Sequence, residues 1–205
     1  MSPLAVIFDL DGTLIDSEPW HKSAELETFA HFGLEIRVEE LMPYTGKILK
    51  DMLAGLAPGM TVETFLEVER PILARHIEEN IHRFADASRL VESLSVPLAM
   101  ATSSMRWYVD AMCARFPELA TSFSVRVCQA DIQSGKPDPE IMLLAANRLG
   151  VDPAACWVIE DSRNGVLSAR AAGCYAIGVD RHGEGHLDDV AHRVVRSLDT
   201  LLELE

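Results

Sequence analysis

The sequence predicts an α/β fold in which helices flank a parallel sheet. Short apolar runs rich in strand formers recur along the chain, and several of them stop at an acidic or hydroxylated residue. Segments with the helical spacing of apolar residues lie between these runs. Such an alternation is typical of a parallel α/β sheet, and it is interrupted once, by a long helical stretch after the first strand.

The expected strands are short and apolar, as the buried strands of parallel sheets are. The first spans residues 4–8 and stops at Asp9, and the second spans residues 96–101 and stops at Thr102. The others are expected over residues 124–128, where the pattern is weakest, and over 156–159 and 175–179. A parallel sheet built from these segments places the residues that follow them along one edge.

Two helices in the second half of the chain carry their own start and stop signals. Asp138 can cap a helix, Pro139 suits its first position, and Gly150 suits its end. A second helix, rich in small residues, is expected over residues 164–172 and ends at Gly173. Both helices follow strand candidates, as the alternating pattern requires.

The stretch from residue 19 to residue 83 shows no strand-like run, and helical spacing dominates it instead. One apolar stripe is formed by Leu73, Ile77, Ile81 and Phe84. Pro71 is expected to kink or divide the helix that carries this stripe. We therefore expect an α/β core formed by residues 1–15 and 87–205, and a helical insertion formed by residues 16–86.

The composition disfavours several classes of partner. The 205 residues carry a formal net charge of −14, and an acidic surface repels nucleic-acid backbones and anionic lipids. No stretch is long enough to span a membrane, and the apolar run at residues 4–8 is too short for a signal peptide. The widely spaced cysteines are Cys113, Cys128, Cys156 and Cys174. We therefore expect a cytoplasmic protein with free thiols, and a monomer, because no long exposed apolar stripe demands a partner.

Polar residues follow several of the predicted strands, where ligands bind in open parallel sheets. Asp9 and Asp11 follow the first strand, and Glu160 and Asp161 follow the fourth. Carboxylates that gather at one edge repel one another, and an all-oxygen donor set selects a hard cation, Mg²⁺ before zinc or copper. A magnesium ion, together with Lys136 from the loop after the third strand, would hold a phosphate group in this acidic protein.

Four segments together resemble the signatures of the haloacid dehalogenase superfamily. They are Asp9-Leu10-Asp11-Gly12-Thr13, Thr102-Ser103-Ser104, Gly135-Lys136-Pro137 and Glu160-Asp161-Ser162. They occur in the order that the superfamily shows, and the resemblance covers nearly the whole chain. It implies a three-layer, Rossmann-like core with a small all-helical cap inserted after the first strand, as in the subgroup of sugar phosphatases and β-phosphoglucomutase.

The resemblance implies a catalytic role for each matched residue. Asp9 would be the nucleophile that forms an aspartyl-phosphate. Asp11 would protonate the leaving alcohol and then deprotonate the attacking water. Thr102 and the backbone of Ser103 would bind phosphoryl oxygens, and Lys136 would stabilise the phosphate and orient the nucleophile.

The same resemblance implies a magnesium site and a reaction. The carboxylates of Asp9 and Asp161 and the backbone carbonyl of Asp11 would hold Mg²⁺, with Glu160 close by. The implied reaction is hydrolysis of a phosphomonoester, a small phosphorylated metabolite such as a sugar phosphate. Phosphoryl transfer depends on positioning and on neutralising charge, which these residues supply.

The insertion is expected to contact the leaving group. His21 resembles a histidine found at that place in many capped members of the superfamily, where it would support acid–base chemistry or bind the leaving group. The alternative is a surface histidine on the first helix of the insertion.

Tyr44-Thr45-Gly46-Lys47 resembles the loop of the cap that faces the substrate, so Gly46 and Lys47 are candidate substrate-binding residues. Lys47 or Lys50 could meet a second anionic group or lie in solvent. The other histidines expected at the surface are His76, His82, His182, His186 and His192.

Two alternative functions share the residues of the core. A phosphomutase needs a site for a second phosphate, and Met105 and Arg106 stand where the mutase has lysine and asparagine, so that only Arg106 could supply a contact. A non-catalytic binding protein on the same fold would tolerate loss of a signature residue, and all of these are intact. One departure concerns the second hinge of the cap, where Phe84-Ala85-Asp86-Ala87 replaces the Pro-Gly of many relatives.

Overall fold

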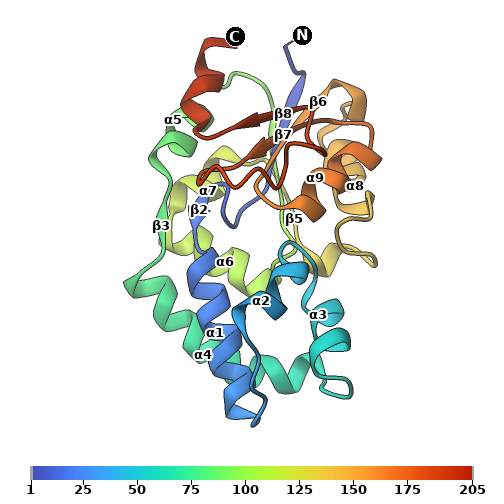
Figure 1. Ribbon diagram of the computed structural model, residues 1–205. Helices are drawn as coiled ribbons and strands as arrows, with labels where there is room; N and C mark the ends of the chain where they lie inside the picture. Colours follow the sequence, from blue (N-terminus) through green and yellow to red (C-terminus); the bar gives the residue numbers. More distant parts are fainter. Residues whose placement is uncertain (1, 205) are drawn as a thin grey trace.

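A single parallel sheet organises the chain, of which the computed structural model describes residues 2–204 (Figure 1). The sheet has six strands in the order β5-β4-β1-β6-β7-β8. All neighbouring pairs in it are parallel. From one edge to the other the strands are β5 (Val125–Val127), β4 (Leu98–Ala101), β1 (Ala5–Phe8), β6 (Cys156–Glu160), β7 (Tyr175–Val179) and β8 (Arg193–Val195). The predicted α/β class is therefore confirmed.

Helices cover both faces of the sheet, which gives three layers. One face packs against α5 (Ala85–Ser93), α6 (Arg106–Arg115), α7 (Pro117–Ser122) and the 3₁₀ segment η4 (Leu198–Leu204). The other face packs against α8 (Glu140–Leu149) and α9 (Arg163–Ala171), and short 3₁₀ turns η2 (Gln129–Asp131) and η3 (Pro153–Ala155) connect elements nearby. Because side chains alternate along a strand, β1 sends Val6 and Phe8 to the first face and Ala5 and Ile7 to the second.

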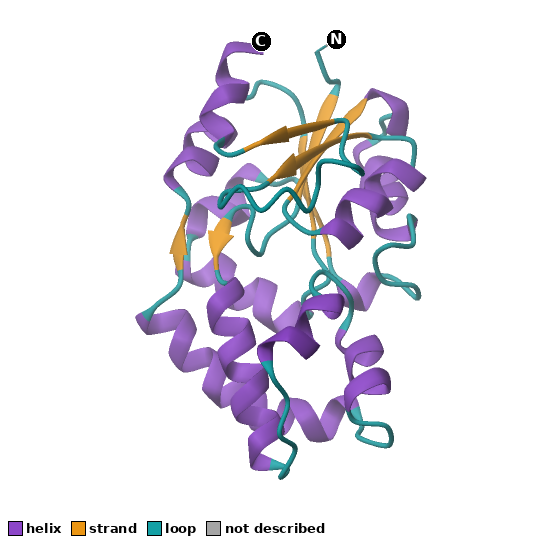
Figure 2. Cartoon of the chain, viewed as in Figure 1, coloured by secondary structure: helices purple, strands orange, loops and turns teal. Residues whose placement is uncertain are grey.

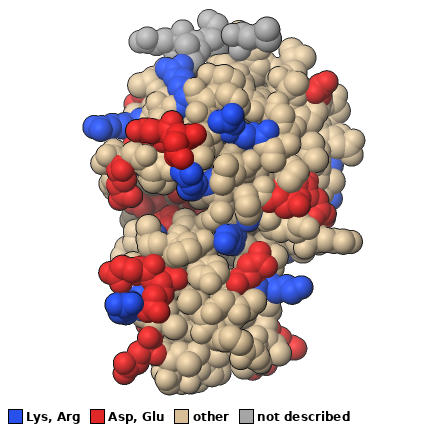
Figure 3. All heavy atoms as spheres, turned by 45° about the vertical axis from the view of Figure 1, so that its right-hand side comes forward, with Lys and Arg blue, Asp and Glu red and all other residues tan. Residues whose placement is uncertain are grey.

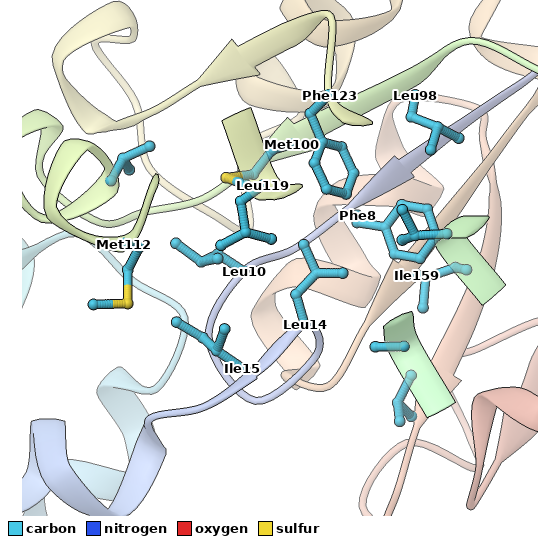
Figure 4. Close-up of a cluster of buried hydrophobic side chains, with 14 of the residues drawn as sticks. Phe8, Leu10, Leu14, Ile15, Leu98, Met100, Met112, Leu119, Phe123 and Ile159 are labelled. Atoms are coloured by element: carbon cyan, nitrogen blue, oxygen red, sulfur yellow. The ribbon is translucent and has the colours of Figure 1, made fainter. Parts of the chain in front are cut away.

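The core on the first face is built from large side chains (Figure 4). The ring of Phe8 contacts that of Phe123 edge to face, with 5.7 Å between the ring centroids. Leu10, which lies between Asp9 and Asp11, and Leu14, which follows the acidic loop, are also buried in this cluster. The loop that carries Asp9 and Asp11 is thus anchored by apolar side chains, which limits how far its carboxylates can move.

The strand predictions need corrections at their ends and at one edge. β4 begins at Leu98 instead of residue 96, and β6 continues to Glu160. β8 was not predicted at all; its sequence is Arg193-Val194-Val195, too short and too polar to stand out as an apolar run. The first of the two predicted helices, α8, begins one residue later than expected, after Pro139. The second, α9, begins one residue earlier than expected, at Arg163. Asp138 does accept a hydrogen bond from the backbone N of Glu140, at 2.9 Å, and Gly150 ends α8 with a φ of 71°.

A helical segment lies between two short strands that leave and re-enter the core (Figure 2). β2 (Ile15–Asp16) and β3 (His82–Arg83) pair in antiparallel fashion. The expectation that residues 19–83 contain no strand is therefore wrong at residues 82–83; a two-residue strand is too short to show periodicity. The helices between the strands are α1 (Glu18–His31), α2 (Val38–Leu41), η1 (Met42–Tyr44), α3 (Leu49–Leu56) and α4 (Val62–Glu79).

These helices have a hydrophobic cluster of their own. Phe29 of α1 and Phe65 of α4 are fully buried in it, with 5.1 Å between their ring centroids. α4 runs through Pro71 without interruption, so Pro71 does not divide the helix, and the expected kink stays a prediction. Proline removes one helical hydrogen bond, and the packing of α4 against α1 outweighs that loss.

Arg181 joins the second hinge to the acidic loop. Its Nη1 donates to Asp86 Oδ2 at 2.8 Å, and its Nη2 donates to the carbonyl oxygen of Thr13 at 3.0 Å. The guanidinium also lies over the ring of Phe84, 3.6 Å from the centroid. The same Asp86 oxygen accepts hydrogen bonds from Ser197 Oγ and from the backbone N of Leu198, at 3.0 and 2.9 Å. In place of Pro-Gly, this chain therefore uses an ion pair to fix the hinge.

Replacing Asp86 with alanine is expected to lower the free energy of unfolding by about 2–3 kcal/mol, because it leaves Arg181 and two further donors without their buried acceptor. Burial raises the pKa of Asp86, but the hydrogen bonds from Arg181 and Leu198 outweigh it, so the pKa lies below its ordinary value. The stabilisation is thus present at neutral pH and is lost as the pH falls below about 4. Urea denaturation at neutral and acidic pH measures both effects. Asp110→Ala, at an exposed position of α6, is the control, and an equal loss in both variants would contradict the assignment.

The surface carries charges of both signs. On the face shown in Figure 3, acidic and basic side chains are interspersed over the upper and lower parts of the molecule. Within residues 2–204, none of the helices combines the length and the apolar composition that crossing a membrane requires.

Candidate active site

The register of the sheet brings the predicted site residues to one edge. Phe8 of β1 is level with Met100 of β4 on one side and with Ile159 of β6 on the other. The residues that follow, among them Asp9 and Thr102, therefore leave three adjacent strands at the same height. The backbone N of Asp9 donates to the carbonyl oxygen of Ile159 at 3.0 Å, which fixes the start of the acidic loop.

Lys136 lies buried beneath this edge and joins two of its carboxylates. Its Nζ donates to Asp9 Oδ1 and to Glu160 Oε1, both at 2.6 Å, and to the carbonyl oxygen of Ala101 at 3.1 Å. Burial lowers the pKa of Lys136, but the negative charges of Asp9 and Glu160 outweigh burial and raise it above its ordinary value. Lys136 is therefore a permanent cation, and it fixes the orientation of the Asp9 carboxylate.

Asp9, Glu160 and Asp161 form a set of oxygen donors that suits a divalent ion. One ligand atom from each lies within 4.8 Å of the others. Burial, reinforced by Glu160 and opposed by Lys136, raises the pKa of Asp9 well above its ordinary value. Burial and the charges of Glu160 and Asp9 do the same to the pKa of Asp161. A hard cation would relieve this repulsion, so the chemistry of the donors fits Mg²⁺.

Close packing of backbone against carboxylate shapes the same corner. Gly12 has a φ of 77°, and a Cβ built on it would lie 2.0 Å from Asp161 Oδ2. Only glycine fits this position, because both the conformation and the space exclude a side chain. Glu160 is held by its other oxygen as well, since Oε2 accepts from the backbone N and the Oγ of Ser162, at 2.7 and 2.8 Å.

The Asp11 carboxylate points away from the metal corner and is surrounded by donors. Its Oδ1 accepts from Ser17 Oγ at 2.6 Å and from Tyr108 Oη at 2.9 Å. Its Oδ2 accepts from Ser104 Oγ at 2.6 Å and, over a longer 3.4 Å, from Thr102 Oγ1. The side chain of Asp11 is therefore occupied by these donors and does not face the expected metal site. Its backbone carbonyl oxygen remains as the expected metal ligand.

His21 of α1 completes this cluster with an ion pair. Its Nε2 lies 3.2 Å from Asp11 Oδ1. Burial lowers the pKa of His21, but the Asp11 carboxylate outweighs it and raises the pKa to about 9. Burial raises the pKa of Asp11, and the charge and hydrogen bond of His21 lower it to well below its ordinary range. At neutral pH the pair therefore holds one proton, on the imidazole.

The loop between η1 and α3 docks on the edge of the sheet. Ser103 Oγ donates to the carbonyl oxygen of Gly46 at 2.7 Å, and Asn164 Nδ2 donates to that of Thr45 at 2.9 Å. Gly46 has a φ of 78°, and a Cβ on it would lie 2.3 Å from Ser162 Oγ. The close approach of this loop to the core therefore depends on glycine at position 46.

One cavity connects these parts of the chain. Its lining includes most of the residues predicted from the sequence, namely Asp9, Asp11, His21, Gly46, Lys47, Thr102, Ser103, Glu160 and Asp161. Lys136 lies behind this lining and reaches it through Asp9. Lys50 is exposed at the surface of α3 and does not line the cavity. Lys47 does, with its Nζ 5.3 Å from the centroid of the Tyr44 ring.

Sequence reasoning missed several residues of the cavity. Tyr108 donates to Asp11 from α6, far away in the sequence, and the only signal is its place in a buried stripe with Met112. Glu69 of α4 is buried and lines the cavity; its signal is a charged residue between Leu66 and Leu73, within the apolar stripe of the helix. Glu25 of α1 lines the same cavity.

The expectation that His76 lies at the surface is wrong. The side chain is buried, and its ring stacks on that of Trp20 with 5.1 Å between the centroids. Nδ1 of His76 lies 3.1 Å from Nδ2 of Asn80. The residue follows Leu73 by three positions on α4 and so belongs to the stripe that faces α1. His82, His182, His186 and His192 are exposed, as expected.

Comparison with protein families and curated proteins gives one consistent result. The family model of haloacid dehalogenase-like hydrolases matches residues 6–179. The chain is 31% identical over 182 residues to fructose-1-phosphate phosphatase YqaB of Escherichia coli (strain K12), with 85% of this chain and 95% of that protein covered. It is 32% identical over 178 residues to hexitol phosphatase B of the same organism, with 82% and 80% covered.

Comparison with solved structures extends the likeness to three dimensions. CbbY from Rhodobacter sphaeroides in complex with phosphate superposes with a TM-score of 0.82 at 26% identity, over 97% of this chain and 96% of that one. A putative β-phosphoglucomutase from Thermotoga maritima superposes with a TM-score of 0.72 at 28% identity, over 100% and 98%. Both likenesses include the helices between β2 and β3, since they span nearly the whole chain.

Proposed function

The chain belongs to the haloacid dehalogenase-like hydrolases, and we propose that it is a magnesium-dependent phosphatase. The proposed substrate is a small phosphorylated metabolite, and a sugar phosphate is the first candidate. The named relatives that are phosphatases of fructose 1-phosphate and of hexitol phosphates support this proposal. The observation that carries it is the convergence of Asp9, Asp11, Lys136 and Asp161 on one cavity edge.

Asp9 is the proposed nucleophile. Lys136 holds its carboxylate by Oδ1, and burial keeps bulk water away from it. The carboxylate attacks phosphorus, the bond from phosphorus to the ester oxygen breaks, and the aspartyl-phosphate forms. In the second half, water attacks phosphorus, the acyl phosphate bond breaks, and Asp9 and inorganic phosphate are regenerated. Thr102 and the backbone of Ser103, which line the cavity, would hold phosphoryl oxygens during both halves.

Asp11 and His21 are the proposed acid–base pair. The pair holds one proton at neutral pH, and transfer of that proton through Asp11 to the ester oxygen neutralises the leaving alkoxide. The pair then accepts a proton from the attacking water, which restores its first state. Ser17, Ser104 and Tyr108 keep the carboxylate in place between the two steps.

The proposed Mg²⁺ would be held by Asp9 and Asp161, with Glu160 beside them and the backbone carbonyl of Asp11 as a further ligand. It would neutralise negative charge on the phosphoryl oxygens and on the gathered carboxylates. Lys136 supplies the second positive charge from below. Two cations at one edge explain how a chain of net charge −14 can bind a phosphate.

The helices within residues 16–86 are proposed to act as a cap. Their loop at Thr45 and Gly46 contacts the core through Ser103 and Asn164, and the rest of the segment joins the core through β2 and β3. Hinge motion at these strands would admit substrate, and docking of the loop would exclude water from the cavity.

The phosphomutase alternative needs a site for a second phosphate. Arg106, the cation that could replace the contacts of the mutase, forms an ion pair with Asp131 and does not line the cavity. This favours hydrolysis over isomerisation. Incubation with a hexose 1-phosphate and a bisphosphate activator tests the choice: free phosphate supports the hydrolase, whereas an isomeric sugar phosphate supports the mutase.

We further propose that the protein acts on its own in the cytoplasm. All cysteines are free thiols, at positions 113, 128, 156 and 174, which suits a reducing compartment. A small substrate needs no macromolecular partner. Size-exclusion chromatography with light scattering tests the monomeric state.

Removal of divalent metal is expected to stop turnover of p-nitrophenyl phosphate, because the carboxylates then lack their counterion and repel the anionic substrate. The measurement is release of p-nitrophenolate by metal-free protein before and after addition of Mg²⁺, with a loss of about a hundredfold or more. Addition of Ca²⁺, a larger ion, serves as the control for unspecific charge screening. Full activity in the presence of a chelator would contradict the proposal.

A further inference from the structure

Carboxyl groups of α1 and α4 form part of the lining of the cavity. Glu18, Glu25 and Glu69 all contribute to the lining. Glu18 is neutralised by Lys22, whose Nζ lies 2.8 Å from its Oε2. Within residues 2–204, the side chains of Glu25 and Glu69 make no hydrogen bond and no ion pair; only burial and nearby charges act on them. Two carboxyl groups in the cavity are therefore free to bind a ligand.

Glu69 is the better enclosed of the two, with 6% of its surface exposed. Burial raises its pKa, and the charges of His21 and Arg70 lower it only in part. Burial raises the pKa of Glu25 to about 8; His21 and Lys22 oppose this change, whereas Glu69 and Glu18 reinforce it. Burial therefore favours the protonated form of both side chains, and in that form a carboxyl group donates one hydrogen bond and accepts others.

Further polar atoms in the same lining lack partners. Nε1 of Trp107 and Oε1 of Gln129 are buried and make no hydrogen bond within the described part of the chain. The first is a neutral donor and the second a neutral acceptor. Buried polar atoms without partners are unfavourable, so a ligand or ordered water is expected to satisfy them.

The cations of the lining are committed elsewhere or lie at the phosphate end. His21 pairs with Asp11, and Lys22 pairs with Glu18. Lys47 remains, and it follows Gly46, whose carbonyl oxygen accepts the hydrogen bond of Ser103. Lys47 thus belongs to the loop that contacts the phosphate-binding edge, whereas Glu25 and Glu69 come from the long helices opposite.

We propose that Glu25 and Glu69 bind hydroxyl groups of the leaving alcohol, so that the enzyme takes phosphate esters of neutral polyhydroxylated alcohols and rejects esters that carry a second anionic group. A hydroxyl group both donates and accepts, as these side chains do. A carboxylate or a second phosphate at this end would meet carboxyl oxygens without a free cation. This inference rests on the proposed phosphatase activity and names the substrate class of the same site.

The test compares kcat/KM for sorbitol 6-phosphate, fructose 1,6-bisphosphate, 2-phosphoglycolate and p-nitrophenyl phosphate. We expect the wild type to prefer sorbitol 6-phosphate by about tenfold or more over fructose 1,6-bisphosphate and 2-phosphoglycolate, the two competitors that carry a second anionic group. In Glu69→Leu, the ratio of kcat/KM for sorbitol 6-phosphate to that for p-nitrophenyl phosphate is expected to fall by about tenfold. Glu69→Gln keeps a neutral donor and acceptor and is expected to stay within about threefold of the wild type.

Two further variants sharpen the test. Glu69→Lys is expected to raise the relative kcat/KM for 2-phosphoglycolate, because it places a cation where the second anionic group would lie. Glu67→Gln, on the exposed side of the same helix, is the matched control and is expected to match the wild type on all four substrates. Thermal denaturation of each variant shows whether it folds.

The outcomes separate this inference from the function on which it rests. Absence of p-nitrophenyl phosphate turnover in the wild type would overturn the phosphatase itself. Turnover with a preference for 2-phosphoglycolate or fructose 1,6-bisphosphate would leave the phosphatase intact and overturn the hydroxyl-binding role. An equal loss on all substrates in Glu69→Leu would also overturn it, since a residue that reads the alcohol must change selectivity.

Discussion

Asp9→Asn is expected to reduce turnover of p-nitrophenyl phosphate by about ten-thousand-fold or more, because an amide cannot form the aspartyl-phosphate. The fold should survive the change. Burial and neighbouring carboxylates raise the pKa of Asp9, so a neutral side chain at this position removes an unfavourable charge. Lys136 keeps its contacts with Glu160 and with the carbonyl oxygen of Ala101. The melting temperature of the metal-free variant is therefore expected to equal or exceed that of the wild type.

Steady-state kinetics and thermal denaturation of the same preparation check this prediction. Asp110→Asn is the matched control, because Asp110 is exposed on α6 and does not line the cavity. The control should retain wild-type turnover. Activity of Asp9→Asn within tenfold of the wild type would refute the role of Asp9 as nucleophile. The melting curve shows whether the variant is folded, so that a loss of activity can be assigned to the chemical role of Asp9.

The parts of the site that could be predicted are those that follow buried strands. Runs such as residues 4–8 are apolar on both faces, and Asp9 stops the run abruptly, so both the strand and the position of the carboxylate can be read locally. β8 and the pair of β2 and β3 could not be predicted, because two or three residues show no periodicity. Their existence depends on pairing with distant strands.

The cavity residues that come from helices were beyond local reasoning for a different reason. Tyr108 and Glu69 lie on helices whose sequences would suit any amphipathic helix, and only the docking of α4 and α6 around the cavity gives them a role. His76 illustrates the same limit, since a polar residue on a charged helix is buried by its neighbour Trp20. A charged residue inside the apolar stripe of a helix is the sequence signal that indicates a functional residue, because burying a charged side chain costs free energy.

Lys136→Met is the second change with a large expected effect, and it acts on stability and activity together. Methionine keeps the unbranched apolar stem, is one atom shorter than lysine and removes the charge, so Asp9 and Glu160 face each other without a buried cation. Loss of one partner of a buried ionic cluster lowers the free energy of unfolding by about 3–5 kcal/mol. Loss of a positive charge at the phosphate is expected to reduce turnover by about a hundredfold or more. Urea denaturation and p-nitrophenyl phosphate kinetics measure the two effects.

The dependence on pH identifies the cause of the instability. The pKa of Lys136 is raised, so its contribution is complete below about 10.4, the pKa of an unfolded lysine, and is lost only at still higher pH. In Lys136→Met the Asp9 carboxylate loses the positive charge that opposes the effect of burial, so its pKa rises further above the ordinary value. The variant therefore loses stability as the pH rises above about 4, the pKa of an unfolded aspartate, and the gap to the wild type widens. Adding Glu160→Gln removes one of the two charges and is expected to restore much of the stability without restoring turnover. A gap that does not change with pH, or a double variant less stable than Lys136→Met, would show that packing and not charge explains the loss.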